Sequence, residues 1–312
     1  MDTLDNLRAF IATAECGSFS QAARQQGLVP SVVAKRIDQL EWRIRAPLFT
    51  RSTRRLRLTD VGERYLPEVR RLIQEVDDTL AGMARSGGGI EGHIRIKIPT
   101  TLGVLRLSAL LQQFMAAQPL ISLDVVLADR SVNPVEEGFD VAIGARPDTY
   151  GQVQEHPLCP IQRRLCASRE YLERRGKPEA PVQLMDHDCL VFATSGTPWE
   201  FIGPQGLVGV QVRARLRSND GMALCRAALA GQGIAMLADY LVAPHLRSGA
   251  LVEVLPQLRL PDIWLKALVP DNRMELPRIQ ALLVWLGSQL KASPPPQETV
   301  ANNSHGFAGV GT

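Results

Sequence analysis

Between Arg24 and Arg57 the chain carries a dense cluster of cationic side chains. Nine lysine and arginine residues stand there against two acidic residues, which gives this segment a net charge of +7. The whole chain of 312 residues has a formal net charge of +3, so the remainder is net negative at −4. Cations gathered in one segment of an otherwise acidic chain can neutralise phosphate groups. We therefore expect a phosphate-binding surface here; a solvated basic face is the less favoured alternative.

The residues within this basic segment and just before it predict two short helices joined by a tight turn. Ser20 is suited to cap the first helix, and Gly27 can end it in a left-handed conformation. Pro30 suits the first position of a second helix, in which Val33 and Ile37 have apolar helical spacing. Two helices with a glycine at the turn form a helix-turn-helix, whose second helix can enter the major groove of DNA.

Candidates for contact with DNA come from both predicted helices and from the loop that follows them. By their numbering Ser31, Lys35 and Arg36 lie near one face of the second helix, and lysine or arginine suits the guanine acceptors of the major groove. Arginine and leucine then alternate up to Leu58, which predicts a small two-stranded wing whose arginines meet phosphates or the minor groove. We expect DNA contacts from Ser20, Ser31, Lys35, Arg36, Arg51, Arg54 and Arg55.

A family resemblance runs without a gap from Gly17 to Gly62. The residues that carry it are Gly17-Ser-Phe-Ser20, Ala22-Ala23, Ser31, Ile37, Leu40-Glu41, Pro47-Leu48-Phe49, Arg51, Arg54, Leu58-Thr59 and Gly62. This pattern resembles the N-terminal winged helix-turn-helix of LysR-type transcriptional regulators.

Three departures from the family pattern bear on local structure. Val29 stands where an N-capping serine or threonine is usual, so the second helix lacks a side-chain cap worth about 1 kcal/mol. Ala34 replaces a frequent serine and removes one contact with DNA that a serine could make. Gln26 and Arg45 occupy places where a core leucine and a turn glycine are common, which affects local packing and the turn after the second helix. The basic surface is retained in spite of these changes.

A long amphipathic helix is predicted from Thr59 to about Met83, with Thr59 or Asp60 as its cap. Pro67 removes one backbone hydrogen bond, so it should bend the helix near its first turns; the alternative is that the helix begins after it. Apolar residues recur at the spacing of a coiled coil, at Leu66, Val69, Ile73, Val76 and Leu80. This spacing implies dimerisation through a partner helix; the alternative is packing on the chain's own second domain.

Beyond the linker Arg85–Gly89, alternating strands and helices indicate an α/β sheet with parallel pairing. The expected fold class is therefore α plus α/β: an N-terminal winged helix-turn-helix, a long linker helix, and a C-terminal α/β effector-binding domain. The expected boundaries are 1–58 for the winged helix-turn-helix, 59–88 for the linker helix and glycine-rich hinge, 89–292 for the α/β domain, and 293–312 for a disordered tail.

The second half resembles the effector-binding domain of the same family, which is built like the periplasmic solute-binding proteins. The stretches Gly138–Gly144, Gly231–Ala235 and Leu268–Arg273 carry this likeness. The resemblance implies a small-molecule cleft between two subdomains, one of residues 91–161 and 266–292 and the other of residues 162–265.

Candidates for the cleft come from the tips of strands and the starts of helices, where free backbone N–H groups favour anions. They are Thr100, Thr101, Arg146, Ser195, Asn219 and Asp220. Many family members bind small carboxylates, so the resemblance favours an organic anion as the effector. For the hydroxyl and amide side chains, a role as simple helix caps is the alternative.

Signals for an enzyme, a cofactor or a metal are weak. The pair Gly231 and Gly233 lacks the third glycine of a dinucleotide-binding fingerprint and follows a helix instead of a strand. The five histidines are isolated, and no GxSxG, HExxH or P-loop motif occurs. We therefore expect a protein that is not an enzyme and uses no cofactor or metal.

Cysteine usage and the N-terminus bear on location. The cysteines, which have no CxxC spacing, are scattered as expected for reduced thiols of a cytosolic protein, at Cys16, Cys159, Cys166, Cys189 and Cys225. The N-terminus lacks the basic start and apolar run of a signal peptide. No apolar stretch approaches the roughly 20 residues of a membrane span. These features predict a cytoplasmic location without membrane contact.

The chain thus places a basic helix-turn-helix, a coiled-coil seam and an α/β cleft in that order. This order predicts a transcription regulator that binds double-stranded DNA as a homodimer or homotetramer. A small-molecule effector, with a carboxylate favoured, is expected to control it, and RNA polymerase is a further candidate partner. The alternative is a solute-binding or enzymatic α/β protein with an accessory helical head. That alternative predicts no salt-dependent binding of duplex DNA by residues 1–88.

Overall fold

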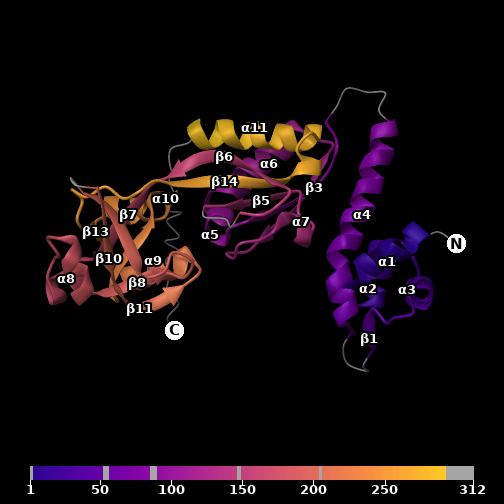
Figure 1. Ribbon diagram of the computed structural model, residues 1–312, viewed down its shortest axis with the longest axis horizontal. Helices are drawn as coiled ribbons and strands as arrows, with labels where there is room; N and C mark the ends of the chain where they lie inside the picture. Colours follow the sequence, from indigo (N-terminus) through magenta and orange to yellow (C-terminus); the bar gives the residue numbers. More distant parts are fainter. Residues whose placement is uncertain (1–2, 52–55, 85–89, 146–148, 204–205, 293–312) are drawn as a thin grey trace, which may run out of the picture.

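The computed structural model describes residues 3–51, 56–84, 90–145, 149–203 and 206–292. It contains a small helical head, one long helix and two α/β lobes (Figure 1). The head consists of α1 (Thr3–Cys16), α2 (Phe19–Gln25), α3 (Pro30–Ile44) and the antiparallel wing strands β1 (Phe49–Arg51) and β2 (Leu56–Leu58). The long helix α4 (Asp60–Ala84) follows. The winged helix-turn-helix, linker helix and α/β domain of two lobes confirm the expected fold class.

A small core of aromatic and aliphatic side chains holds the helices of the head together. Phe10 is 1% exposed, and its ring centroid lies 5.6 Å from that of Phe49. Phe19 approaches the same Phe49 ring at 6.2 Å. Such edge-on aromatic pairs contribute about 0.5–1.5 kcal/mol each beyond their buried area. Helix α4 adds to this core, because Leu66 and Val69 pack against it.

The turn between α2 and α3 follows the expected pattern. Gly27 has a φ of +65°, and Pro30 is the first residue of α3. Val29 precedes it in an extended conformation and provides no side-chain cap. Gln26 is accommodated where the family favours leucine, because its Nε2 donates a hydrogen bond to the carbonyl of Arg8 at 3.0 Å. A polar side chain can therefore fill this position in the head.

The start of α2 differs from the prediction, which made Ser20 its cap. The helix begins at Phe19 after an extended Ser18, so Ser20 lies inside the first turn. The helix begins there because its first backbone hydrogen bond is donated by the N–H of Ala22 to the carbonyl of Ser18, at 3.0 Å. Ser18 therefore occupies the cap position, although its side chain makes no capping hydrogen bond.

Helix α4 begins as predicted and runs without a break to Ala84. The hydroxyl oxygen of Thr59 accepts a hydrogen bond from the N–H of Gly62 at 3.1 Å, which caps the first turn. Pro67 lies inside the helix, so the alternative that the helix begins after Pro67 is wrong. A proline removes one N–H donor, and the remaining backbone hydrogen bonds are sufficient to continue the helix.

Each lobe is built on a five-stranded sheet. The first has the order β4-β3-β5-β14-β6, from β3 (Gly92–Ile98), β4 (Ile121–Leu127), β5 (Val141–Gly144), β6 (Val153–Ile161) and β14 (Ile263–Pro270). The second has the order β11-β8-β12-β7-β13, from β7 (Arg163–Ser168), β8 (Asp188–Phe192), β11 (Arg213–Ser218), β12 (Ile234–Ala238) and β13 (Leu251–Glu253). A separate antiparallel hairpin joins β9 (Pro198–Gly203) to β10 (Gly206–Gln211).

The parallel pairing expected from the alternation occupies only part of each sheet. Strand β3 is parallel to β4 and β5, and β8 is parallel to β11 and β12. In contrast, β14 is antiparallel to β5 and β6, and β7 is antiparallel to β12 and β13. Because β14 pairs with β6 along its whole length, it returns the chain from the second lobe to the first. The return begins at Ile263, slightly before the predicted residue 266.

Helices cover the sheets and bring polar groups to the strand ends. The first lobe has α5 (Thr100–Leu102), the π-helical segment η1 (Gly103–Leu107), α6 (Ser108–Ala117), α7 (Pro134–Glu137), η3 (Asp271–Arg273) and α11 (Pro277–Ala292). The second has α8 (Arg169–Arg175), η2 (Pro181–Asp186), α9 (Gly221–Leu229) and α10 (Asp239–Arg247). Elements α5, η1 and α6 form one continuous helical run directly after β3.

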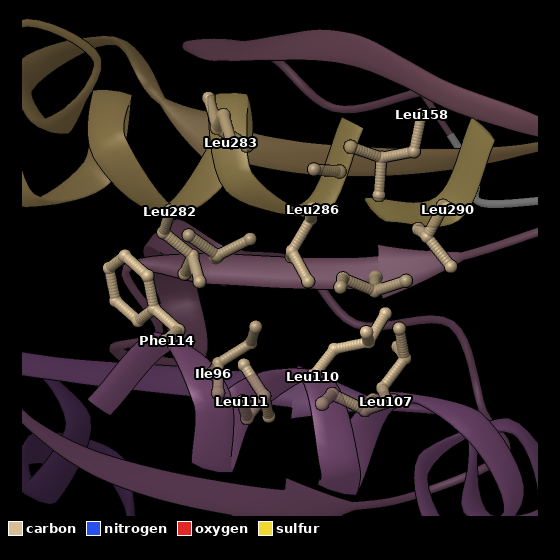
Figure 2. Packing of buried hydrophobic residues seen from close by; sticks show 14 of the residues in the cluster. Ile96, Leu107, Leu110, Leu111, Phe114, Leu158, Leu282, Leu283, Leu286 and Leu290 are labelled. Atoms are coloured by element: carbon tan, nitrogen blue, oxygen red, sulfur yellow. The ribbon is translucent and has the colours of Figure 1, made fainter. Parts of the chain in front are cut away.

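The core of the first lobe lies between α6, α11 and the sheet. Figure 2 shows Leu110 and Phe114 of α6 pointing toward Leu282 and Leu286 of α11, with Ile96 of β3 beside them. All five are buried. A fully buried side chain of this kind stabilises the fold by about 1.5–3 kcal/mol. This core fixes β3, and therefore the groups at its carboxyl end, in place.

Candidate functional site

One exposed face of α3 carries candidates for contact with DNA bases. Ser31 and Lys35 are exposed and stand about one helical turn apart on this face. Trp42 follows about two turns after Lys35 on the same side and is 83% exposed. These side chains are therefore available to an external partner without any change in the packing of the head.

Arg36 does not share this face, so the expectation that Ser31, Lys35 and Arg36 lie together is wrong for Arg36. Each residue of a helix turns the side-chain direction by about 100°, which brings Arg36 toward α1. There its guanidinium donates a hydrogen bond to the carboxylate of Asp5 at 2.5 Å. Arg36 thus braces α3 against α1.

Glu41 fixes the far end of α3 to the wing. Its Oε1 accepts hydrogen bonds from the backbone N–H groups of Leu48 at 2.7 Å and Phe49 at 3.1 Å. Helix α3 ends at Ile44, and the cap residue Arg45 that follows has a left-handed backbone with a φ of 54°. Glycine adopts this conformation without strain, whereas a residue with a Cβ atom pays about 1–2 kcal/mol. The turn therefore forms despite the arginine, at a cost in stability.

Two of the remaining DNA candidates, Ser20 and Arg51, lie on α2 and the wing. Ser20 is exposed on α2. Arg51 is the last residue of β1, whereas Arg54 and Arg55 lie outside the described residues. Arg57 is exposed on β2 and faces Thr50 across the wing.

A cleft of about 580 Å³ lies between the two lobes. Its walls come from β3, β5 and the start of α5 in the first lobe, and from the loop after β8, β9 and α10 in the second. Of the predicted effector contacts, Thr101 and Ser195 line this cleft. The others do not: Thr100, Asn219 and Asp220 are absent from its walls, and Arg146 lies outside the described residues.

Asp220 is both a helix cap and a bridge between the lobes. Its Oδ1 accepts a hydrogen bond from the N–H of Ala223 at 2.7 Å, which caps α9. Its Oδ2 accepts a hydrogen bond from the hydroxyl of Thr101 in the first lobe at 2.8 Å. Both carboxylate oxygens are thus engaged within the protein, which agrees with the helix-cap alternative. Thr100 is also used locally, since its N–H donates to the carboxylate of Asp129 at 2.9 Å.

Two family models match the chain over the architecture described above. The model of the bacterial regulatory helix-turn-helix protein, lysR family, matches residues 4–63, and the model of the LysR substrate binding domain matches residues 87–291. The chain belongs to the LysR family of transcriptional regulators. It is therefore a regulator with a DNA-binding head and an effector-binding domain, in a family that is not enzymatic.

Similar proteins agree with this assignment. The HTH-type transcriptional regulator PtxR of Pseudomonas aeruginosa is 30% identical, with 93% of this chain and 94% of PtxR covered. The HTH-type transcriptional activator TtdR of Escherichia coli is 31% identical, with coverage of 83% and 85%. The solved structure of CrgA, a LysR-type transcriptional regulator from Neisseria meningitidis, matches with a TM-score of 0.58 at 26% identity and covers 92% of this chain and 98% of CrgA. The alternative of a solute-binding protein or enzyme gains no support.

Lys97 is a cleft residue of this LysR-family regulator that the sequence patterns did not single out. It lies near the carboxyl end of β3 and is 4% exposed. Burial lowers the pKa of its ammonium group below the ordinary value, and the charge of Asp129 opposes that shift. Polar and apolar residues alternate along β3, as they do in a strand with one exposed face. This pattern therefore does not distinguish Lys97 from a surface lysine. A usable signal is its place at the carboxyl end of a parallel strand, where open α/β sheets bind ligands.

The predicted dimerisation seam on α4 divides into two parts. Leu66 and Val69 pack against the regulator's own head, and Ile73 is 7% exposed. Val76 is half-buried, and Leu80 is 55% exposed. The first part of the seam is therefore covered within one chain, whereas its end is open to a partner.

Helix α4 also contacts the first lobe, through polar and backbone groups. The side-chain amide of Asn272 donates a hydrogen bond to Oε1 of Glu75 at 3.1 Å. Gly138, with a φ of +68°, lies so close to α4 that an added Cβ would be 3.3 Å from the carbonyl oxygen of Pro67. These contacts of α4 with the second domain involve polar and backbone groups, whereas the alternative for the seam was packing of its apolar side chains.

The cysteines of the regulator are free thiols, and most are unreactive by position. Cys159, Cys166, Cys189 and Cys225 are buried. Burial raises the pKa of Cys166 and Cys189 to about 12 and that of Cys225 to about 11. Such thiols carry little of the thiolate that attacks oxidants or binds metals. Among the described residues, no group of side chains could hold a metal ion, and none of the helices has the length and apolar character to cross a membrane.

Proposed function

We propose that Ser31 and Lys35 read base edges in the major groove. Their exposure on one face of α3 supports this assignment, and lysine can donate to the guanine acceptors. Arg36 is assigned to holding α3 in place through its bond to Asp5. The contacts with phosphates or the minor groove are assigned to Ser20, Arg51, Arg54 and Arg55.

The effector is proposed to be a small organic anion that binds in the cleft beside Thr101 and Ser195. The cleft lies at the carboxyl ends of β3 and β5, where ligands of open α/β sheets bind. The hydroxyl of Ser195 can donate a hydrogen bond to a carboxylate oxygen, whereas the single O–H of Thr101 is already donated to Asp220. Closure of the two lobes around such an anion is the step that would carry the signal.

Assembly is proposed to occur through α4, first as a homodimer and then as a homotetramer. The seam of Leu66, Val69, Ile73, Val76 and Leu80 has coiled-coil spacing, and the exposure of Leu80 leaves room for a partner helix. Cleft closure would shift the equilibrium between two oligomer geometries and so change the spacing of the paired heads on DNA. The proposed setting is the cytoplasm, where the DNA-bound regulator would meet RNA polymerase.

The proposed functional units keep the boundaries expected from the residue patterns. They are the head at 1–58, the linker helix and hinge at 59–88, the effector domain at 89–292 with subdomains 91–161 plus 266–292 and 162–265, and a tail at 293–312.

The observation that carries this proposal is an exposed recognition face joined in one chain to a cleft at the carboxyl ends of β3 and β5 that Ser195 lines. The test is binding of the purified full-length chain to a duplex of its own upstream intergenic sequence, measured by fluorescence anisotropy against salt. Tight, sequence-selective and strongly salt-dependent binding that a small carboxylate alters is expected. Binding no better than to a random duplex would contradict the operator assignment, with Val29, Ala34 and Arg45 as the first residues to restore.

A further inference from the structure

Lys97 has little within the described protein to balance its charge. Its side chain is 4% exposed, and its Nζ makes a single long hydrogen bond among the described residues, to the carbonyl oxygen of Ile143 at 3.5 Å. No ion pair within 4.0 Å joins it to a described carboxylate. The cation is therefore enclosed without a close counter-charge from the part of the chain that the structure describes.

The other charged groups of the cleft wall are either exposed or already engaged. Arg130 is 63% exposed in its side chain and forms an ion pair, and Glu200 is exposed. Asp129 accepts a backbone N–H at 2.9 Å. Arg163 donates to the carbonyl oxygen of Pro261 at 3.0 Å. Lys97 is thus distinguished by burial together with weak satisfaction of its donors.

An enclosed ammonium group without an anion in direct contact is costly, because it has lost water and gained few hydrogen bonds in return. Lysine has three N–H donors, of which one is used, weakly, in the described structure. An anionic ligand that enters the cleft would supply both the missing charge and the missing acceptors. Charge-assisted hydrogen bonds of this kind are the stronger ones in proteins.

The rest of the wall is mainly apolar. Large side chains that line it are Leu102, Val132, Ile161, Phe192, Trp199 and Leu265. Trp199 is 4% exposed and brings an indole ring to the second lobe's side of the cleft. A volume of about 580 Å³ suits a compact organic molecule whose apolar body contacts these side chains.

We infer that Nζ of Lys97 binds the carboxylate of the effector, and that the effector is a monocarboxylic acid with a compact apolar body, such as an aromatic acid. One buried cation matches one carboxylate, and the apolar wall matches the rest of the molecule. This inference rests on the proposed effector cleft and is independent of the base-contact assignment.

The test is thermal unfolding of the purified full-length chain with three probes: benzoate, acetate and the neutral isostere benzamide. Benzoate is expected to raise the Tm saturably, with an apparent affinity at least tenfold above that of acetate and benzamide. In Lys97→Met the apparent affinity for benzoate should fall at least tenfold, because the charge-assisted bond is lost. The unliganded variant should melt at or above the parent's temperature, because a buried cation has been removed.

The matched control is Lys266→Met, which removes a half-exposed lysine of β14 that pairs with Glu155 at 2.6 Å. It should respond to benzoate as the parent does. Lys97→Gln provides a second neutral variant if methionine does not fold. An equal benzoate response in the parent and in the Lys97 variants, equal binding of benzamide, or no saturable response of the parent would overturn the inference. Failure of the parent to bind its operator would contradict the proposed function separately, since this measurement contains no DNA.

Discussion

The recognition face and the effector cleft are built over very different distances along the chain. The face of α3 takes Ser31 and Lys35 from one helix, held by a head whose core closes within the first part of the sequence. The cleft joins Lys97 and Thr101 of the first lobe to Ser195 of the second. The first site depends on local helical spacing, whereas the second exists only after two sheets have folded and met.

This difference extends to how each site relates to stability. The functional side chains of α3 are exposed, so they contribute contacts to a partner and little to the fold. The cleft residues are tied into the protein: Asp220 caps α9 and accepts a bond from Thr101, and Lys97 is buried. Substitutions of Ser31 and Lys35 should therefore change DNA binding alone, and those in the cleft should change stability and binding together.

The largest expected effect comes from removing the central aromatic ring of the head, which tests whether the head and the lobes are stabilised independently. Phe10→Ala deletes a side chain that is 1% exposed and should cost about 3–5 kcal/mol of head stability. Calorimetry should show the melting of the head lowered while the melting of the lobes stays in place, with DNA binding lost. The matched variant Phe114→Ala, also 1% exposed but in the first lobe, should do the reverse. A single transition that moves as a whole in both variants would show that head and lobes unfold as one unit.

A smaller effect is expected on the recognition face itself. Lys35→Ala should cost about 1–3 kcal/mol in operator binding and reduce the discrimination between bases at one position of the operator, while the Tm of the head stays the same. Arg36→Ala should instead loosen α3, because it removes the bond to Asp5, and weaken binding to all sequences alike. Anisotropy titrations against operator variants separate the two results. If Arg36→Ala reduces base discrimination at one operator position and Lys35→Ala does not, then Arg36 contacts the base and the assignment to Lys35 is wrong.

The same contrast explains which features the residue patterns could predict. Gly27, Pro30 and Thr59 adopt the expected roles because each acts on backbone groups only a few residues away. Ser20 was misplaced because the boundary of a short helix depends on where the first backbone bond forms. Arg36 was misplaced because its partner, Asp5, belongs to another helix.

In the cleft, residue type alone did not identify the correct neighbours. Thr100 and Thr101 are adjacent hydroxyl residues after the same strand, and the turn of the helix directs only Thr101 into the cleft. The pairing of Thr101 with Asp220 spans two lobes and has no local signal. Lys97 has the pattern of a surface lysine in its own strand, yet it is buried, with its Nζ beside the carbonyl of Ile143 on the neighbouring strand β5.

The bridge between the lobes can be weakened without removing a cleft wall. Thr101→Val keeps the shape of the side chain and removes the hydrogen bond to Asp220, which should lower the stability of the lobes by about 1.5 kcal/mol. Chemical denaturation, followed by the fluorescence of the lobe tryptophans, measures this change. The control Thr100→Val should have a smaller effect, since Thr100 uses its backbone N–H in its bond to Asp129. Equal losses in both variants would contradict a bridging role for the Thr101 hydroxyl.

The smallest predicted effect is a gain, at the end of α3. Arg45 has a left-handed backbone with a φ of 54°, a conformation that glycine adopts without strain. Arg45→Gly should stabilise the head by about 0.5–1 kcal/mol, less than the full strain, because glycine also makes the unfolded chain more flexible. Arg45→Asn, which removes the same charge and tolerates the left-handed region, should give part of the gain. The Tm of the head measures both variants, and salt titration of DNA binding shows whether the lost charge matters. A loss of stability in both variants would contradict the prediction. It would mean that the contacts of the arginine side chain stabilise this turn by more than the strain of its backbone destabilises it.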